Sequence, residues 1–240
     1  MPTLFISDLH LDAERPEIGE QFLAFAAGEA RDADALYILG DLFESWVGDD
    51  DPNPHYAAMK AAIRGVSDAG VPVYFMHGNR DFMIGDGFAA ETGVRILEDP
   101  TVVDLYGESV LLSHGDAWCT DDVEYQNVRA MTRNPQWQAA MLEKPLEVRL
   151  AIAAGARAES QARNAMLPEE IMDVNPGAIR DAMREHGVRT ILHGHTHRPA
   201  VHRFELDGDD ATRIVLGDWY DHGSVVRWDT GGYSLDEMPR

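Results

Sequence analysis

Seven side chains of the kinds that bind divalent metals occur in five short clusters, and each cluster follows an apolar run that predicts a β-strand. They are Asp8, His10, Asp41, Asn79, His114, His195 and His197. Oxygen and imidazole donors without thiolates suit a manganese, iron or zinc pair better than a structural zinc ion, which usually takes sulfur. Because open α/β sheets bind ligands at the carboxyl ends of their strands, the pattern predicts a layered α/β fold with one metal site.

The order of apolar runs and turn signals agrees with this fold class. Strands are expected at 3–7, 35–39, 71–77 and 190–193, with a hairpin at 101–105 and 109–113 and closing antiparallel strands at 200–206, 212–217 and 224–228. Helices are expected at 16–31, 56–69 and 178–186, and Pro145, Gly155 and Pro168 divide a mostly helical segment from 135 to about 166. We expect one domain over residues 1–240, with the 128–175 helices inserted as a cap.

Charge and cysteine content narrow the range of partners and compartments. The formal net charge is −22, from 42 acidic and 20 basic residues, which argues against nucleic-acid binding. Residues 128–190 differ, because they carry nine basic and eight acidic side chains. The single cysteine, Cys119, indicates a reducing compartment. The first residues are interpreted as a strand rather than a signal peptide, and no stretch approaches the roughly 20 apolar residues of a membrane span.

Each cluster alone has an ordinary structural alternative. In an extended segment Asp8 and His10 would point to the same side, as two ligands of one metal would. The same sequence pattern is equally compatible with a solvated aspartate and a packed histidine that bind no metal. Asn79 offers a neutral oxygen ligand, and the guanidinium of Arg80 can bind two phosphate oxygens. The alternative interpretation is that Asn79 only belongs to a turn. Together the clusters supply ligands for two cations, which at about 3.5–4 Å apart can clamp the attacking and leaving oxygens of a phosphorus centre.

The motifs, in this order, resemble those of the calcineurin-like metallophosphoesterase superfamily. They are Asp8-x-His10, Gly40-Asp41, Gly78-Asn79-Arg80-Asp81, His114-Gly115-Asp116 and Gly194-His195-x-His197, and they span nearly the whole chain. Most members of that superfamily have histidine where this chain has Arg80. The arginine form and the runs at 33–44, 48–54, 119–122 and 171–175 are similar to a narrower family, the UDP-2,3-diacylglucosamine pyrophosphohydrolases of lipid A synthesis.

The resemblance implies a fold, a cofactor and a reaction. The fold is a four-layer α/β/β/α sandwich with a helical cap over the site, and the cofactor is two Mn²⁺ ions per chain. The reaction is hydrolysis of the pyrophosphate bond of UDP-2,3-diacylglucosamine to UMP and 2,3-diacylglucosamine 1-phosphate. The implied ligands are Asp8, His10 and His197 for one metal, Asn79, His114 and His195 for the other, and Asp41 as the bridge.

The resemblance also implies which residues contact the substrate. These are Asn79, Arg80, Asp122, Ser160, Asn164 and His195. We expect Asp41, Arg80 and His195 to be catalytic, with Arg80 and His195 stabilising the charge that builds on the phosphoryl oxygens. The family usually has lysine two or three residues after the position of Asn164, whereas position 167 here is leucine, so Arg163 or Arg157 is expected to replace one contact.

The predicted cap is rich in apolar side chains, which either pack on the core or line a groove for two acyl chains. They are Trp137, Met141, Leu142, Leu146, Val148, Leu150 and Ile152. Basic residues among them are expected to meet diphosphate or anionic head groups, namely Lys144, Arg149, Arg157 and Arg163. We expect a cytoplasmic monomer that binds a lipid-linked UDP-sugar, contacts the cytoplasmic face of the bacterial inner membrane peripherally and binds no nucleic acid.

Two other functions are compatible with parts of this pattern. A soluble nucleotide phosphodiesterase or protein phosphatase would share the metal motifs but would have no use for an apolar groove. A metal-free scaffold on the same fold would be expected to have lost some ligands, whereas this chain keeps all seven.

Overall fold

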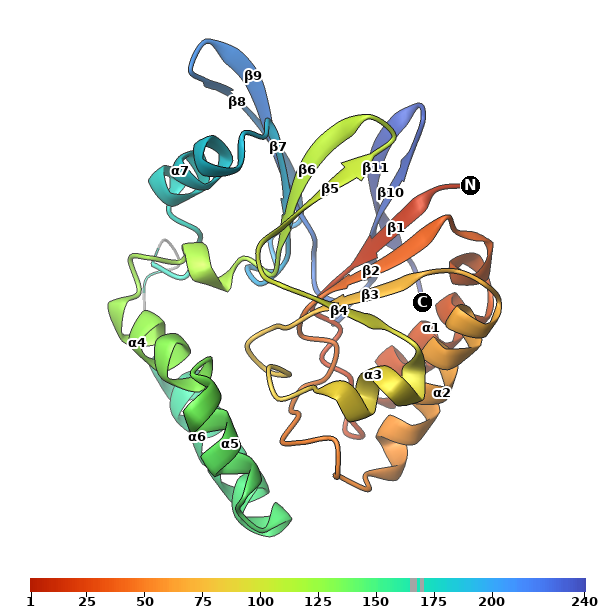
Figure 1. Cartoon of the computed structure of the whole chain (residues 1–240), viewed down its shortest axis with the longest axis vertical. Helices are drawn as coiled ribbons and strands as arrows, with labels where there is room; N and C mark the ends of the chain where they lie inside the picture. Colours follow the sequence, from red (N-terminus) through yellow and green to blue (C-terminus); the bar gives the residue numbers. More distant parts are fainter. Residues whose placement is uncertain (165–167, 169–170) are drawn as a thin grey trace.

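The computed structural model describes residues 1–164, 168 and 171–240, with only the backbone described at Asn164. Within this part of the chain, two β-sheets pack face to face and helices cover their outer faces (Figure 1). Leu167, where a substrate contact of the family was expected to be lost, lies outside these described residues. None of the helices described has an apolar stretch of the length that a bilayer crossing requires.

The first sheet has six strands, of which β1 to β4 are parallel and the other two antiparallel. In spatial order they are β11 (Gly232–Met238), β10 (Gly223–Asp229), β1 (Thr3–Ile6), β2 (Ala35–Leu39), β3 (Val73–Met76) and β4 (Arg95–Leu97). The helices that cover it are α1 (Pro16–Ala27), α2 (Pro54–Asp68) and α3 (Asp86–Thr92). The start of α2 is set locally, because the Asn53 side chain accepts a hydrogen bond from the His55 N–H at 3.0 Å and Pro54 follows the cap.

The second sheet has five strands and carries one helix. In spatial order its strands are β5 (Thr101–Leu105), β6 (Glu108–Ser113), β7 (Thr190–His193), β9 (Asp209–Val215) and β8 (Ala200–Leu206). The predicted hairpin is β5–β6, and its turn residues Tyr106 and Gly107 both have positive φ, the backbone that a tight antiparallel hairpin requires. Helix α7 (Pro176–His186) packs on the outer face through Ile179 and Met183.

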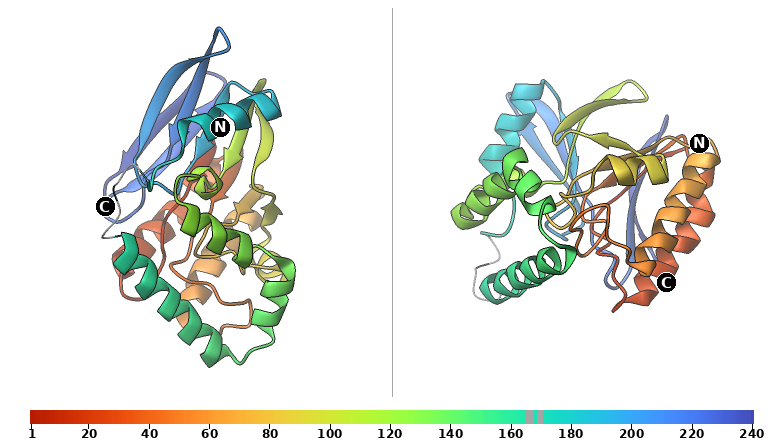
Figure 2. Two further views of the ribbon diagram at one scale, coloured as in Figure 1. Left: turned by 90° about the vertical axis from the view of Figure 1, so that its left-hand side faces the viewer. Right: turned by 60° about the horizontal axis from the view of Figure 1, so that its bottom comes forward.

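Three separate apolar clusters define four layers. One lies between α1–α3 and the first sheet, and another lies between α7 and the second sheet. The third fills the space between the two sheets, where Phe5 and Trp228 of the first sheet meet Leu112 and Ile214 of the second. This arrangement is the α/β/β/α sandwich that was predicted, and Figure 2 shows the two sheets and their helices from two further sides.

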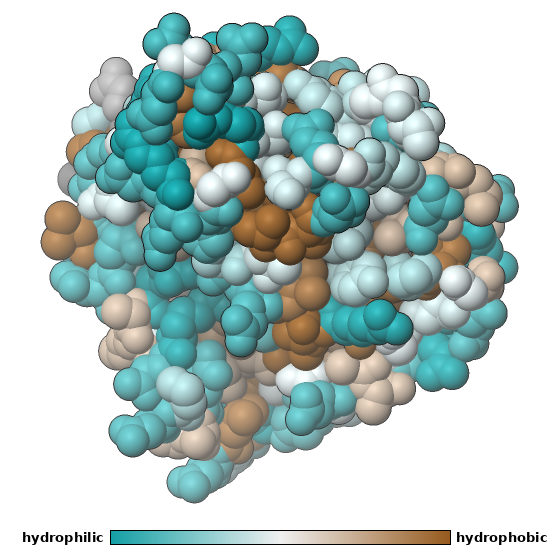
Figure 3. Space-filling view, turned by 45° about the horizontal axis from the view of Figure 1, so that its top comes forward, coloured by the Kyte–Doolittle hydropathy of each residue, from teal (hydrophilic) through white to brown (hydrophobic). Residues whose placement is uncertain are grey.

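Three more helices stand together beside the sandwich, away from α1–α3 (Figures 1 and 2). They are α4 (Val123–Thr132), α5 (Pro135–Leu142) and α6 (Leu146–Asn164). Pro145 separates α5 from α6 as expected, but Gly155 lies inside α6 and does not divide it, since a single glycine costs a helix only about 1 kcal/mol. On the face shown in Figure 3 most of the surface is hydrophilic, and apolar residues form a band through its centre.

Candidate metal centre

The structure brings all seven predicted ligands to one edge of the two sheets. Asp8 and His10 follow β1, Asp41 follows β2 and Asn79 follows β3, whereas His114 follows β6 and the remaining two histidines follow β7. Strands β1 to β3 run parallel in the first sheet, and β6 runs parallel to β7 in the second. Because parallel strands end on the same side, their five loops converge between the sheets.

Most of these ligands sit on an unusual backbone. Positive φ angles occur at Asp8 (56°), His10 (52°), Asp41 (51°), His195 (67°) and His197 (56°). This left-handed conformation costs a non-glycine residue about 1–2 kcal/mol and concentrates at functional sites. It also corrects one expectation: Asp8 and His10 do not share a side through the alternation of an extended strand, because both lie beyond the end of β1 in left-handed turns.

One group of donors consists of Asp8, His10 and His197. The Nε2 atoms of the two imidazoles lie 3.2 Å apart, and His197 Nε2 lies 3.3 Å from Asp8 Oδ1. Asp8 is fully buried and His10 is 3% exposed. Their ligand atoms all lie within 4.8 Å of one another, so one ion can contact all three.

A second group consists of Asn79, His114 and His195. Asn79 Oδ1 lies 3.0 Å from His114 Nε2 and 2.9 Å from His195 Nδ1. The rings of His114 and His195 are perpendicular neighbours, with centroids 5.0 Å apart. The His195-x-His197 pair is therefore divided between the two groups, as the resemblance implied.

Asp41 lies between the two groups. Its Oδ2 is 3.8 Å from His10 Nε2, and its Oδ1 is 3.8 Å from His114 Nε2. The same Oδ1 accepts a hydrogen bond from the Arg80 backbone N–H at 2.8 Å. One carboxylate thus faces both groups, the geometry that a bridging ligand requires.

In three of the histidines, Nδ1, the ring nitrogen that points away from the other donors, lies close to an acceptor group that the sequence did not identify. Glu44 Oε2 lies 3.1 Å from His10 Nδ1, Asp218 Oδ2 lies 3.2 Å from His197 Nδ1, and the Leu39 carbonyl oxygen lies 2.9 Å from His114 Nδ1. Carboxylates and carbonyls on the far nitrogen of a histidine fix the ring and its tautomer at metal sites. Nothing in the local sequence marks Asp218, because only the tertiary fold brings it to His197.

The loops after β2 and β3 interlock through Asp81. Its Oδ1 accepts from the N–H of Gly78 at 2.8 Å and of Asp41 at 3.3 Å, and its Oδ2 accepts from the N–H of Leu42 at 2.7 Å. A Cβ atom on Gly78 would lie 2.1 Å from Asp41 Oδ1. The two loops are therefore in contact along their backbones, and only glycine fits at position 78.

Burial and neighbouring carboxylates determine the pKa values of the histidines at the site. Burial opposes the charged form of His197, but Asp218 and Asp8 raise its pKa to about 10. Burial likewise opposes the charged form of His114, whereas Asp41, Asp8 and Asp116 raise its pKa to about 8. Burial and the neighbouring His114 lower the pKa of His195 to about 4. Without bound cations, the carboxylates thus retain protons on two of the imidazoles.

The donors fit divalent metal ions. Asp8 Oδ1 is buried and accepts no hydrogen bond among the described residues, and the nearest positive group is the His197 imidazole, whose Nε2 lies 3.3 Å away. A buried carboxylate oxygen of this kind needs a cation beside it, either the protonated imidazole or a metal ion in its place. Two imidazole nitrogens that face each other, and an amide oxygen that faces two others, are better explained by a shared ion than by direct pairing. The side chains offer only oxygen and nitrogen, which suits metals such as manganese, iron or zinc.

A groove of about 660 Å³ leads from the metal centre along the helices α4 to α6. Asn79, Arg80 and Ser160 line it, and its walls are largely apolar. The apolar residues that line it include Trp46, Phe82, Met83, Val128, Met131, Trp137, Met141, Leu150 and Ile152. The predicted apolar cap residues divide here, since Met141 packs into the core, whereas Leu150 and Ile152 are exposed along the groove.

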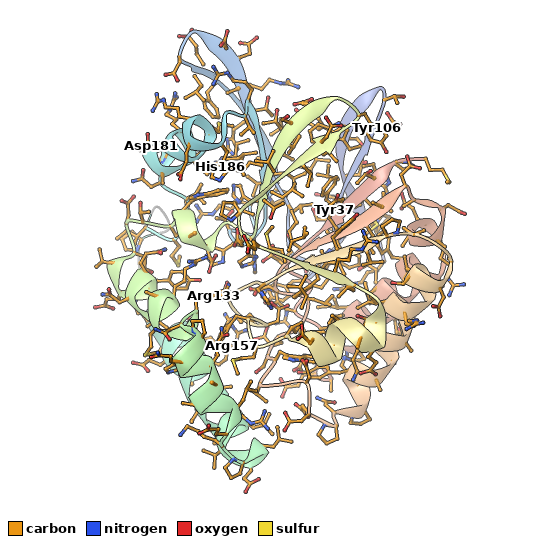
Figure 4. The ribbon with its side chains drawn as sticks, in the orientation of Figure 1. Tyr37, Tyr106, Arg133, Arg157, Asp181 and His186 are labelled. Carbon is orange, nitrogen blue, oxygen red and sulfur yellow. The ribbon has the colours of Figure 1, made fainter. Side chains whose placement is uncertain are left out.

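The remaining predicted contacts have different surroundings. Asp122 caps α4 by accepting from the Tyr125 N–H at 2.9 Å, and it also forms an ion pair with Arg163. Arg157 pairs with Glu44, and Figure 4 shows it between the helices and the sheets. Arg149 does not face the surface as expected. It is 2% exposed, and its guanidinium binds Asp50 and the Val47 carbonyl oxygen.

Two of the predicted positions are described less fully or not at all. Asn164 ends α6, and only its backbone is described, while Leu167 lies outside the described residues. Arg80 lines the groove beside Asn79, and among the described residues none accepts a hydrogen bond from its Nε. A guanidinium nitrogen without a protein acceptor at the metal edge of the groove is suited to an anionic ligand.

The fold and the donor set define a metal-dependent phosphoesterase. The profile of the calcineurin-like phosphoesterases matches residues 1–199, and the chain belongs to this family. Within the family, a UDP-2,3-diacylglucosamine hydrolase of Stenotrophomonas maltophilia (strain K279a) is 54% identical over 247 residues, which cover 100% of both chains. Proteins of the same name from Klebsiella pneumoniae (54% over 239 residues, 100% of both) and Xanthomonas oryzae pv. oryzae (53% over 245 residues, 99% of both) are similarly close. The chain belongs to the same branch of the family as these three proteins.

Proposed function

We propose that this protein hydrolyses the pyrophosphate bond of UDP-2,3-diacylglucosamine, releasing UMP and 2,3-diacylglucosamine 1-phosphate. The observation that carries this function is the largely apolar groove whose lining includes Asn79 of the donor cluster and the neighbouring Arg80. A substrate with a diphosphate next to two acyl chains needs a metal centre for the diphosphate and an adjoining apolar groove for the chains. Relatives with that activity in their names match the chain over its full length.

Two Mn²⁺ ions are the proposed cofactor. Asp8, His10 and His197 would hold one ion, Asn79, His114 and His195 the other, and Asp41 would bridge them. When bound, two such ions lower the pKa of a water molecule and neutralise phosphoryl charge. The proposed set has three oxygen donors, four imidazole nitrogens and no sulfur, which is compatible with manganese.

The chain's own residues would orient the diphosphate and stabilise its charge. Arg80 reaches the groove from the loop after β3, and its fork can bind two phosphoryl oxygens. Burial and the neighbouring His114 lower the pKa of His195 to about 4, so its imidazole is neutral at pH 7 and has one N–H group that can donate a hydrogen bond and one nitrogen that can bind a metal ion. Asn79, Asp122, Ser160 and Asn164 are the further proposed substrate contacts.

Residues 128–175 act as a cap in this proposal, within a single domain that spans residues 1–240. Leu150 and Ile152 are 44% and 41% exposed in the groove, which is a large exposed fraction for aliphatic side chains unless a ligand covers them. Each CH₂ that they remove from water contributes about 0.8 kcal/mol, so two acyl chains would supply much of the binding free energy.

Contact with the membrane follows from the same helices. Val123, Leu142 and Val148 are exposed apolar residues of α4 to α6 outside the groove lining. We place the protein, as a monomer, in the cytoplasm with these helices against the inner leaflet, where its substrate resides. Flotation with anionic vesicles tests this placement, and a protein that stays at the bottom of the gradient would contradict it.

The deciding experiment is product identification. Protein purified without chelator is incubated with Mn²⁺ and the diacylated UDP-sugar, and the products are identified by mass spectrometry. UMP and the lipid 1-phosphate are expected, with turnover abolished by EDTA. Equal turnover of UDP-sugars with and without acyl chains would favour a soluble phosphodiesterase instead, and the absence of bound metal would favour a scaffold.

A further inference from the structure

Helix α4 points three polar side chains toward the ligand loops. Tyr125, Arg129 and Arg133 are spaced four residues apart and so share one face of the helix. The Tyr125 hydroxyl and Arg129 Nε each donate to Asp116 Oδ2 at 2.9 Å. Asp116 is fully buried and lies two residues after His114. The cap is therefore attached to the loop that carries one of the metal ligands.

The last of the three residues reaches a different ligand loop. Arg133 follows the final turn of α4, and its Nη2 donates to the Gly78 carbonyl oxygen at 2.9 Å and approaches the His77 carbonyl oxygen at 3.4 Å. Its guanidinium also lies over the Phe82 ring, 5.6 Å from the centroid. Figure 4 shows Arg133 between the helices and the sheets. One arginine of the cap thus holds the main chain immediately before Asn79.

The two carbonyl groups that Arg133 contacts lie beyond the end of strand β3. Strand β3 ends at Met76, so neither carbonyl lies within the sheet ladder, and Asp81 holds the opposite side of the loop through the Gly78 N–H. The Gly78–Asn79 peptide direction decides where Asn79 Oδ1 points, and that atom lies 3.0 Å from His114 Nε2 and 2.9 Å from His195 Nδ1. A charged donor on the carbonyl fixes this peptide more firmly than a neutral one would.

We propose that Arg133 is a positioning residue that holds the Gly78–Asn79 loop, from the cap helix α4, in the geometry required for metal binding by Asn79, His114 and His195. This inference rests on the proposed two-metal function. It means that the cap and the Asn79 half of the metal centre are coupled through the main chain at Gly78.

The test measures metal binding separately for each site. Mn²⁺ is titrated into metal-free wild type, Arg133→Gln and Arg133→Lys by calorimetry, and electron paramagnetic resonance follows the exchange-coupled signal of two neighbouring Mn²⁺ ions. Removal of contacts that orient metal ligands costs about 10–100-fold in metal affinity. We expect Arg133→Gln to bind one ion normally and a second that much more weakly, with loss of the coupled signal, and Arg133→Lys to recover part of the loss.

A charge-matched control is Arg184→Gln, which removes an exposed arginine paired with Asp207 and Asp181 on α7. It is expected to bind both ions as wild type does. Binding of two ions by Arg133→Gln with wild-type affinity would overturn the inference. So would equal weakening of both sites together with a lowered melting temperature in both Arg133 variants, because that result indicates general destabilisation. A wild-type protein that binds fewer than two Mn²⁺ ions would instead contradict the proposed function.

Discussion

The guanidinium of Arg149, on α6, donates hydrogen bonds to both carboxylate oxygens of Asp50, a residue of the loop between β2 and α2. The arginine is 2% exposed, and it also donates to the carbonyl oxygens of Val47 at 2.7 Å and Lys144 at 3.1 Å. This contact joins the start of α6 to the sandwich. The sequence suggested that Arg149 meets diphosphate or anionic head groups, whereas the structure shows it as a buried structural link.

Replacement of Arg149 by methionine should destabilise the protein. The change leaves two carbonyl oxygens without their donor, so we expect the free energy of unfolding to fall by about 1–3 kcal/mol. Asp50→Asn should cost less, because the Asp50 side chain is 63% exposed and water can replace its partner. Urea unfolding of both variants provides the measurement, and equal losses would contradict the structural role of the arginine.

Asp41→Asn tests the bridging carboxylate with little change of shape. Asparagine tolerates the left-handed backbone at φ 51°, so the fold should be retained. Loss of the charge that faces both donor groups should lower turnover by about 10³-fold, comparable to removal of a major electrostatic stabiliser. Activity and melting temperature are measured together, and near-normal turnover would rule out the bridge.

Asp218→Asn tests a residue that the motifs did not reveal. Asparagine keeps the shape but not the charge next to His197 Nδ1, so Mn²⁺ affinity should fall about 10–100-fold. Asp221→Asn, an exposed aspartate three residues away, is the matched control and should bind Mn²⁺ normally. Titration calorimetry compares the two, and identical affinities would remove Asp218 from the site.

Metal binding should depend on pH in a defined direction. The pKa values of His114 and His197 are raised to about 8 and about 10 in the metal-free protein, so both imidazoles are protonated at pH 7. A cation must displace those protons, and its affinity should therefore rise with pH through about 8 and toward 10. Calorimetry at pH 7 in buffers of different ionisation enthalpy should detect proton release. His197→Gln should release fewer protons, and binding without proton release would contradict these pKa shifts.

The groove predicts a selective effect on substrates. Ile152→Asp places a charge where an acyl chain would lie, so KM for a diacylated substrate should rise about tenfold or more, since each buried CH₂ contributes about 0.8 kcal/mol. Ala158→Asp adds a charge at an exposed position of α6 outside the groove lining, and its KM should stay close to that of wild type. Steady-state kinetics with long and short acyl chains separate the two, and equal effects of both variants would exclude this groove as the acyl site.

The sequence predicted that these seven side chains would gather at one edge of the sheets, because each follows an apolar run that forms a strand. The strand at Ala35–Leu39 and the turn at Tyr106–Gly107 follow from residue types alone. The elements α3, β4 and β11 were not predicted. The first two are short, and β11 is a strand with several polar residues that pairs along its whole length with β10. The helix expected at 16–31 ends at Ala27 and continues after Gly28 as a 3₁₀ turn over Glu29–Asp32.

The sequence did not reveal the residues that contact the proposed metal ligands and fix their orientation. Glu44 and Asp116 occur in quoted motifs but had no assigned role there, and Asp218 was not identified at all. Their positions depend on how the two sheets meet. The same holds for Arg149, whose burial depends on the fit of α6 against the loop at Gly48, where a Cβ atom would lie 2.3 Å from its Nη1.

The absence of a side chain at Gly78 allows the loop of Asn79 to pass against the carboxylate of Asp41. A descendant of this protein that no longer needed metals could discard its histidines one at a time, but it could enlarge position 78 only after Asp41 had moved or gone. A larger residue at position 78 and the present placement of the Asp41 carboxylate therefore exclude each other.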